Sequence, residues 1–525
     1  MRQGARGMSG QAVGGRRGFG QRILDGVERA GNRLPDPATL FLIAIVLLVA
    51  LSAVFAAMGV SAVHPGTGKE VAAVSLLDGA QIRRLLVELP QIFANFPPLA
   101  LVLIVMMGVG VAERTGLIAV SLGAFVRAMP ASLLTVAVVF AGVQSSLATD
   151  AGYVVLTPLA AALYYSVGRH PIAGLAAAFA GVAGGFSANL LLTGLDPLLA
   201  GITQAAARLL DPGYTVQITA NWYLMMALVP LFTIIGTIVT EKIVEPRLNA
   251  TAPVTAKVDV SADLARDADQ AARERRGLIF AGVALLGIVG IVCLLVLPEG
   301  APLVDPANAN NPYDPFLRSL VAILFIAFLV TGIAYGIGAR VIKSDKDVVG
   351  MMGASMSDMG VYIVLAFAVA VFIALFGWSN LGVILAVNGA EFLKAIGFTG
   401  LPLMIGIIVV TGVINILIGS ASAKWAILAP VMVPLLMQVG VTPEATQAAY
   451  RVGDAFTNMI TPLLPYFPLI LVICQRYVPS FGIGSLVATM LPYSIAFGIG
   501  STLLFAIWFG LGLPLGPGIA TMMPG

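Results

Sequence analysis

The chain has 525 residues, of which 59% are hydrophobic and only 10% charged, and its formal net charge is +3. This composition excludes a water-soluble globular protein, because so much apolar surface cannot be hidden from water in one core. The small positive charge does not indicate nucleic-acid binding, and the two cysteines lie in separate apolar runs, which excludes a disulfide framework. An all-α polytopic membrane protein is therefore predicted, with the lipid bilayer as its surroundings.

The first predicted element is a cytoplasmic N-terminal segment over 1–36, which is rich in arginine and lacks the apolar core of a signal peptide. Basic segments stay on the cytoplasmic side of a membrane. The same rule places a basic linker over 241–276 inside, and the loop over 298–317, which holds acids but neither Lys nor Arg, outside. The linker separates an N-terminal transmembrane half, 37–240, from a C-terminal half, 277–525.

Apolar stretches that can cross a bilayer as helices of about 20 residues recur along the chain. Two proline-bearing stretches that are polar at one end, 145–168 and 420–438, are predicted to be re-entrant hairpins instead. The segment 75–95 has apolar residues at helical spacing and is predicted to be an interfacial helix outside the membrane. The candidate spans, several of them short or interrupted, lie near 38–60, 97–112, 131–148, 172–205, 221–240, 277–297, 318–338, 360–378, 401–418, 456–474 and 483–512.

Both halves contain the same succession of features: a small polar loop, an apolar run with prolines, and a broken apolar helix that carries an acid. The succession runs from Gln144 to Pro197 in the first half and from Gly419 to Pro462 in the second. Paired, Gly/Pro-interrupted apolar segments are typical of transporters built from inverted repeats, which bind their substrate where the repeats meet. The sequence therefore predicts inverted-repeat halves with broken helices and a transport site between them.

Charged residues at membrane depth are the first site candidates, because an unpaired charge there costs several kcal/mol. Arg451 and Asp454 stand three apart and share a helix face, so they can pair, either for structure alone or as part of a site. Asp196 precedes a proline, which predicts either a helix end that opens into a cavity or a cap at the membrane interface. The full set of these charges is Asp150, Asp196, Lys424, Arg451 and Asp454.

Uncharged polar groups gather around the second broken helix and its hairpin. Ser420 and Ser422 can offer hydroxyls and free backbone amides to an ion, or return a hydrogen bond to their own helix. Trp425 can stack on an aromatic ligand or lie in the interfacial belt, and Asn415 can serve a site or an interhelical hydrogen bond. Oxygen ligands for a sodium ion, the one cofactor that these groups suit, are available at Ser145, Asn189, Ser420 and Asn458.

Over essentially its whole length the chain resembles the AbgT family of p-aminobenzoyl-glutamate transporters. The resemblance rests on the runs QSSLATDAGYVVLTPLAAALYYSVGRHP (144–171), GGFSANLLLTGLDPLLAGITQ (184–204), GSASAKWAILAPVMVPLL (419–436) and YRVGDAFTNMITPLLPYFPLIL (450–471). It implies a homodimer in the bacterial inner membrane, with about nine spans, two re-entrant hairpins and a water-filled basin. The family's site residues correspond to Asp196, Asn415, Ser422, Trp425, Pro443, Arg451, Asp454 and Pro462.

The expected function is secondary active transport, driven by the proton-motive force, of p-aminobenzoyl-glutamate-like folate catabolites, of sulfonamide antimetabolites that are exported, or of both. The resemblance implies that Arg451 holds an anionic substrate, that Trp425 stacks on its aminobenzene ring, and that Asp196 and Asp454 carry a proton or sodium ion. A sodium-coupled carboxylate importer is the alternative, because polar hairpin tips also suit sodium. An intramembrane enzyme with Asp196 and Asp454 as paired acids is not expected, since neither a GxGD motif nor a nucleophile–base pair accompanies them.

Overall fold

The computed structural model describes residues 35–63, 68–147, 152–255, 258, 260, 264, 267–307 and 312–523. Within these ranges nine helices are long and apolar enough to cross a membrane. The strands of the described chain, β1 (Ser61–Val63) and β2 (Glu70–Ala72), form one antiparallel pair that the sequence did not predict. The expected all-α polytopic membrane fold is confirmed.

The helices of the N-terminal half begin with α2, which Asp36 caps by accepting a 2.9 Å hydrogen bond from the Ala38 N–H. Pro37 opens this helix, where its missing N–H is not needed. The elements of this half are α2 (Pro37–Ala57), α3 (Gly79–Ala94), α4 (Pro97–Arg114), α5 (Leu117–Arg127), η1 (Ala131–Leu133), α6 (Leu134–Gln144), η2 (Ser145–Leu147), the π-helical η3 (Gly152–Leu156), α7 (Thr157–Ser166), α8 (Pro171–Gly184), η4 (Gly185–Ser187), α9 (Leu195–Ala207), α10 (Trp222–Val239), the π-helical η5 (Thr240–Val244) and α11 (Glu245–Thr251).

The C-terminal half contains the most lipid-like helix of the described chain, α13, in which few residues are buried. Beyond its charged first turns this helix packs on α14, and its remaining apolar side chains are exposed, which suits them to face lipid. The elements of this half are α13 (Ala268–Val296), α14 (Asp314–Gly338), α15 (Asp345–Asp358), α16 (Gly360–Trp378), α17 (Leu381–Ala395), α18 (Gly400–Leu417), α19 (Ala421–Gln438), α20 (Pro443–Ala455), α21 (Phe467–Tyr477) and α22 (Ile483–Gly510).

Each re-entrant hairpin is longer than predicted. The first consists of α6 and α7, which both pack along α8, and a 2.8 Å hydrogen bond from Tyr164 Oη to Thr135 Oγ1 joins the open ends of its arms. The arms of the second are α18 and α19, which meet at 418–420 and both pack on α20. The stretches expected as spans near 131–148 and 401–418 contain the first arms of the hairpins, α6 and α18. Both arms of the second hairpin, Gly400–Leu417 and Ala421–Gln438, are counted among the nine helices that are long and apolar enough to cross a membrane.

Two other expected spans are interrupted. The stretch 172–205 divides into α8 and α9, separated by an irregular segment over 185–194 that we call the first break. The stretch 456–474 begins with an irregular segment over 456–466, the second break, and becomes helical only in α21. Polar side chains and prolines give these segments alternatives to the helical hydrogen-bond ladder. Both breaks lie where the sequence predicted broken helices.

Two boundaries differ from the sequence prediction. The expected interfacial helix, α3, leads directly into α4, and together they form one candidate span of 36 residues, Gly79–Arg114. At the other boundary, α10 continues through η5 and α11 as far as Thr251, into the segment predicted as linker. The basic residues that predicted a linker from residue 241 onward therefore do not mark the end of the helix.

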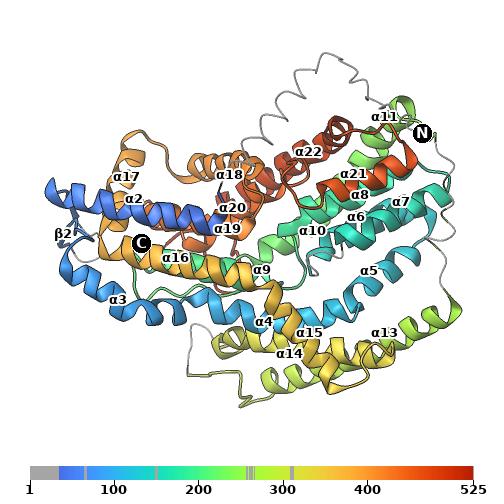
Figure 1. Cartoon of the computed structure of the whole chain (residues 1–525), viewed down its shortest axis with the longest axis horizontal. Helices are drawn as coiled ribbons and strands as arrows, with labels where there is room; N and C mark the ends of the chain where they lie inside the picture. Colours follow the sequence, from blue (N-terminus) through green and yellow to red (C-terminus); the bar gives the residue numbers. More distant parts are fainter. Residues whose placement is uncertain are drawn as a thin grey trace, which may run out of the picture.

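We define the first broken-helix unit as α6–α9 and the second as α18–α21. The last helix of each unit packs against the other unit, an arrangement that we call the exchange of the last helices. After the first break, α9 packs on α19 and α20 of the second unit, and after the second break, α21 packs on α8 of the first. Figure 1 shows α13 and α14 side by side along one edge, next to α4, and α2 beside α16 at the opposite end. This exchange brings both breaks to the middle of the molecule.

Candidate functional site

A cavity of about 340 Å3 lies where the hairpin tips meet the two breaks, and we call it the central cavity. A small-molecule site is typically an enclosed space of this order with a few placed polar groups. Four of the residues that the sequence predicted as site residues line it: Ser420, Ser422, Asp454 and Asn458. The first unit contributes Ser146, Tyr153, Thr193 and Gly194. The two halves thus form one shared wall, as the paired sequence pattern predicted.

Helix α20 carries the charged residues of the second unit, and every residue in it is buried. Its N-terminus is capped by Thr442, whose hydroxyl accepts a 3.2 Å hydrogen bond from the Ala445 N–H, and Pro443 opens it. Gly453 lets α20 approach α18, since a Cβ atom there would lie 2.5 Å from the Ile408 carbonyl oxygen. Pro443 therefore has a role in starting the helix, and Pro462 lies in the second break beyond its end.

The first buried ion pair joins the two units. Arg451 Nη1 lies 2.6 Å from Asp196 Oδ1, and both side chains are almost completely buried. The sequence had allowed Arg451 to pair with Asp454 instead. The structure corrects this, because α9 crosses to the second unit and presents Asp196 to the guanidinium.

Asp196 also organises the end of the first break. Its Oδ2 accepts a 2.6 Å hydrogen bond from the Thr193 N–H and a 3.0 Å bond from the Thr193 hydroxyl. It therefore caps the start of α9 and also compensates a buried cation, a partner that the sequence did not predict for it. On Arg451, Nε and Nη2 are buried without a hydrogen-bond partner among the described residues. A guanidinium with unused donors is suited to bind a further anionic group.

The second buried ion pair is formed by Lys424 and Asp454, which lie on α19 and α20. Asn415 of α18 connects to both sides of this pair. Its Nδ2 lies 2.8 Å from each of three acceptors, the Asp454 carbonyl oxygen, Thr457 Oγ1 and Asn458 Oδ1, and its Oδ1 accepts a hydrogen bond from the Lys424 ammonium. Of the two roles that the sequence left open for Asn415, the structure shows the interhelical hydrogen bond, because one amide links three helical segments.

Trp425 has neither of the two positions that the sequence predicted for it. Its indole is fully buried, stacks on Tyr450 with 4.5 Å between the ring centroids, and donates a 2.9 Å hydrogen bond to Thr203 Oγ1. Thr203 in turn donates a 2.6 Å hydrogen bond to Gln447. Neither the interfacial belt nor an open stacking surface describes this ring, because α9 packs over it. In this conformation Trp425 holds α9 against the second unit.

The first break and the neighbouring end of α6 contain polar groups that are not fully paired. Ser146 donates a hydrogen bond to Asn189 Oδ1, while Asn189 Nδ2 and Gln144 Nε2 are buried without a partner in the described part of the chain. Asn458 of the second break donates a 3.2 Å hydrogen bond to the Ala183 carbonyl at the end of α8. Ser145, expected as a sodium ligand, returns its hydroxyl to the Gly142 carbonyl at 2.6 Å.

Aromatic residues of the cavity wall were not among the predicted site residues. Tyr153 and Tyr466 both line the central cavity and stack on each other, with 4.3 Å between centroids and 9° between planes. Tyr362 of α16 also lines it, and its hydroxyl has no partner among the described residues. Tyr153 and Tyr466 lie inside two of the runs that carry the family resemblance, but nothing in those runs marks them as cavity residues, so only the packing of distant helices reveals their place. Asp150, another predicted candidate, lies outside the described residues.

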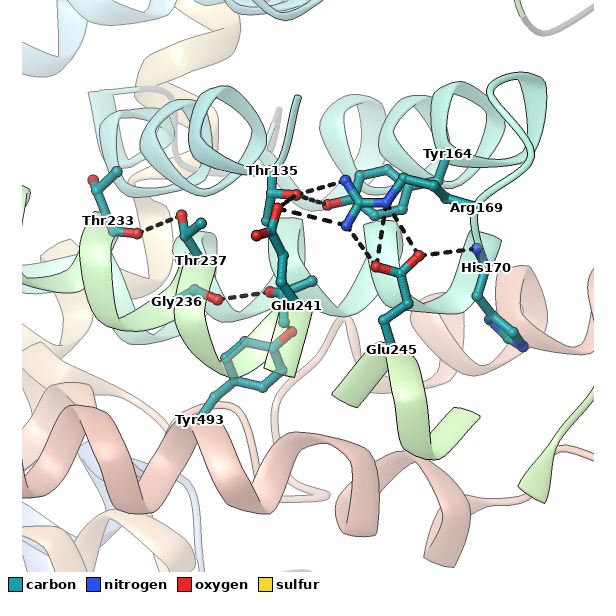
Figure 2. A network of polar contacts seen from close by, with 11 residues as sticks. Thr135, Tyr164, Arg169, His170, Thr233, Gly236, Thr237, Glu241, Glu245 and Tyr493 are labelled. Carbon is teal, nitrogen blue, oxygen red and sulfur yellow. Dashed lines mark hydrogen bonds and ion pairs between the residues drawn. The ribbon is translucent and has the colours of Figure 1, made fainter. Parts of the chain in front are cut away.

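A second polar network lies at the open end of the first hairpin (Figure 2). Arg169 contacts Glu245 through Nε at 3.1 Å and through Nη2 at 2.5 Å, and its Nη1 donates a 2.8 Å hydrogen bond to Thr135. Thr135 donates a 2.8 Å bond to Glu241, and the guanidinium lies over the Tyr164 ring at 4.3 Å. The network fastens the hairpin to the continuation of α10 and contributes no residue to the lining of the central cavity.

Comparison with known proteins gives a consistent result. A sequence profile of the AbgT putative transporter family matches residues 22–523. The p-aminobenzoyl-glutamate transport protein of Escherichia coli strain K12 is 36% identical over 501 residues, which are 95% of this chain and 96% of that protein.

Two solved structures share the fold. The YdaH transporter of Alcanivorax borkumensis is 44% identical, with a TM-score of 0.87, and the match covers 92% of this chain and 100% of that one. MtrF of Neisseria gonorrhoeae, whose structure is described as illuminating a class of antimetabolite efflux pumps, is 43% identical, with a TM-score of 0.87 and coverage of 95% and 100%. The resemblance noted in the sequence is confirmed, and the chain belongs to the AbgT family of transporters.

Proposed function

We propose that this transporter moves p-aminobenzoyl-glutamate-like folate catabolites, sulfonamide antimetabolites or both, and that the proton-motive force drives it. The observation that carries the proposal is the central cavity, whose wall combines both hairpin tips, both breaks and the carboxylate of Asp454. The names of two relatives support the substrates, since one is a p-aminobenzoyl-glutamate transport protein and the other belongs to a class of antimetabolite efflux pumps.

The chemistry of the wall suits such substrates. Tyr153, Tyr362 and Tyr466 offer an aromatic surface for an aminobenzene ring, a role that we move from Trp425 to these tyrosines. The unused donors of Arg451 suit a carboxylate or sulfonyl oxygen. Arg451 is 1% exposed. It therefore reaches substrate only after the neighbouring first break moves.

Energy coupling requires a group whose ion occupancy differs between the inward-open and outward-open states, because a group that is indifferent to the two states shifts no equilibrium. We assign this role to Asp196 and Asp454, the two buried carboxylates that the breaks hold in place. Asp454 lines the cavity directly and is the one that an entering ion meets first. We further infer that the protein is a homodimer of the bacterial inner membrane with a cytoplasmic N-terminus.

The test is flux of radiolabelled p-aminobenzoyl-glutamate and of a sulfonamide in proteoliposomes, with a proton gradient and a sodium gradient imposed separately. Wild type is expected to follow the proton gradient, and Asp454→Asn to lose driven flux while it keeps its expression level and oligomeric state. Asp358→Asn, which removes an exposed carboxylate from α15, is the matched control and is expected to transport normally. Driven flux that persists in Asp454→Asn would contradict the assigned role.

A sodium-coupled carboxylate importer is the second candidate. The observation that favours it is the gathering of oxygen groups at the two breaks, where Ser146 meets Asn189 and where Ser420 and Asn458 line the cavity. Such oxygens are suitable ligands for a hard cation. Flux that follows the sodium gradient and is indifferent to the proton gradient would favour this candidate over the first.

A further inference from the structure

Lys424 is a buried charge of the second unit for which neither the sequence pattern nor the proposed function supplies a role. Its side chain is 0% exposed, and it lies in the first turns of α19, just behind the hairpin tip. A buried ammonium is stable only when an anionic or strongly polar partner compensates for its lost hydration. Lys424 has such partners in Asp454 Oδ1 and Asn415 Oδ1.

The position of the ammonium is set from three helices. Asn415 of α18 uses its amide hydrogens on the backbone and side chains around the second break, so its oxygen is left to face Lys424. Asp454 of α20 presents a carboxylate to the same point. An amide oxygen and a carboxylate oxygen that converge on one buried point are a pair of hard-cation ligands. In this chain the cation at that point is the lysine ammonium.

Lys424 is set back from the central cavity. Asp454 lines the cavity and Lys424 does not, although the two side chains are in contact. The Asp196–Arg451 pair differs, because a guanidinium is a rigid fork that still has unused donors. Lysine is a compact charge on a flexible stem. It can contact the carboxylate at the cavity wall without itself lining the cavity.

We propose that Lys424 is a built-in cation that takes the place of a metal ion beside Asp454, and that it acts as a positioning residue for this carboxylate during transport. This inference rests on the proposed function only for its transport readout. It implies that the second unit needs no sodium ion at Asp454. It also implies that a protein without the lysine ammonium needs a cation from solution in the same place.

The first test is chemical rescue. Lys424→Ala removes the ammonium and leaves space behind Asp454, so transport is expected to fall by at least about tenfold. Methylammonium or ethylammonium in the buffer is expected to restore a measurable part of the transport in this variant, and to leave Asp454→Asn unchanged. Lys394→Ala, which removes an exposed lysine near the end of α17, is the matched control and is expected to behave as wild type. Transport by Lys424→Ala at the wild-type rate, or a loss that neither alkylammonium ion restores, would overturn the proposal.

The second test does not depend on transport. Removing both members of a buried ion pair is milder than removing one, because no uncompensated charge is left. The melting temperature of Lys424→Ala/Asp454→Asn is therefore expected to exceed that of Lys424→Ala, and the result holds even where the single variant is poorly folded. A double variant that melts no higher than the single variant would overturn the inference. If wild type moves none of the tested solutes, the proposed function fails, and this cycle of melting temperatures still tests whether Lys424 is the cation that compensates Asp454.

Discussion

The two polar networks of this protein have similar chemistry and different surroundings. In both, a carboxylate meets an arginine from a distant helix: Asp196 meets Arg451 beside the central cavity, and Glu245 meets Arg169 at the open end of the first hairpin. The side chains of the first pair are 5% and 2% exposed, whereas those of the second are 14% and 23% exposed. The comparison separates the effect of the ion pair itself on stability and transport from the effect of its burial.

The two networks also differ in how many nitrogens of their arginine have a hydrogen-bond partner. Arg169 makes contacts with Glu245 and Thr135 through all three of its guanidinium nitrogens. Arg451 is more deeply buried but leaves two nitrogens without a partner among the described residues. A structural pair is expected to be saturated, because an unmet buried donor costs free energy. We therefore infer that the Asp196–Arg451 pair, which has unused donors, can accept a further partner during transport. The Glu245–Arg169 pair, whose donors are all used, is a structural anchor.

The largest effect is expected from breaking the buried pair. Arg451→Ala leaves Asp196 charged and buried without a cation, which should lower the free energy of unfolding by about 3–5 kcal/mol and abolish transport. The free energy is measured by urea or thermal unfolding in detergent, and transport by flux in proteoliposomes. Arg451→Lys, which keeps the charge but not the fork, is the matched control and should recover stability more than transport. If Arg451→Ala unfolds like wild type, the pair is not the structural link inferred here.

A smaller effect, on stability alone, is expected at the anchor. Glu245→Gln removes the charge from a partly exposed pair and keeps an acceptor for Arg169, which should cost about 2 kcal/mol. Flux per correctly folded molecule should stay within about twofold of wild type, because the network does not line the central cavity. A specific loss of flux in a stably folded Glu245→Gln protein would show that the anchor takes part in the transport cycle.

The sequence alone was sufficient for the class of fold and for the paired breaks, and the reason is physical. Apolar composition identifies a membrane protein. A proline or a polar group inside an apolar run identifies a broken helix, and this signal does not depend on the tertiary fold. Ser420, Ser422, Asp454 and Asn458 were found in this way, because the first two lie at the polar tip of the second hairpin and the other two lie at or beside the second break. Local chemistry predicts local departures from regular structure well.

Partner choice could not be predicted in the same way. Sequence spacing favoured the pair Arg451 and Asp454, but the exchange of α9 between units brings Asp196 to the arginine and leaves Asp454 for Lys424. The same exchange buries Trp425 under α9, although its position beside a hairpin tip had suggested a ligand contact. Both differences arise from packing between segments more than two hundred residues apart in sequence, which no local pattern records.

The smallest effect is expected where a carboxylate is partly exposed to water. Asp347 in the first turn of α15 accepts 2.8 Å hydrogen bonds from the backbone N–H groups of Lys343 and Ser344, which lower its pKa below the ordinary value of 3.8. A carboxylate with a lowered pKa in the folded state stabilises the protein at neutral pH, and this contribution disappears as the pH falls through the lowered value. Asp347→Asn should therefore lower the melting temperature by only about 1 °C at pH 7. The difference from wild type should shrink in melting curves taken below the ordinary pKa.

The matched control is Asp345→Asn, which makes the same change of charge in the same turn. An equal effect of both variants at every pH would mean that general charge, rather than the capping geometry of Asp347, is responsible.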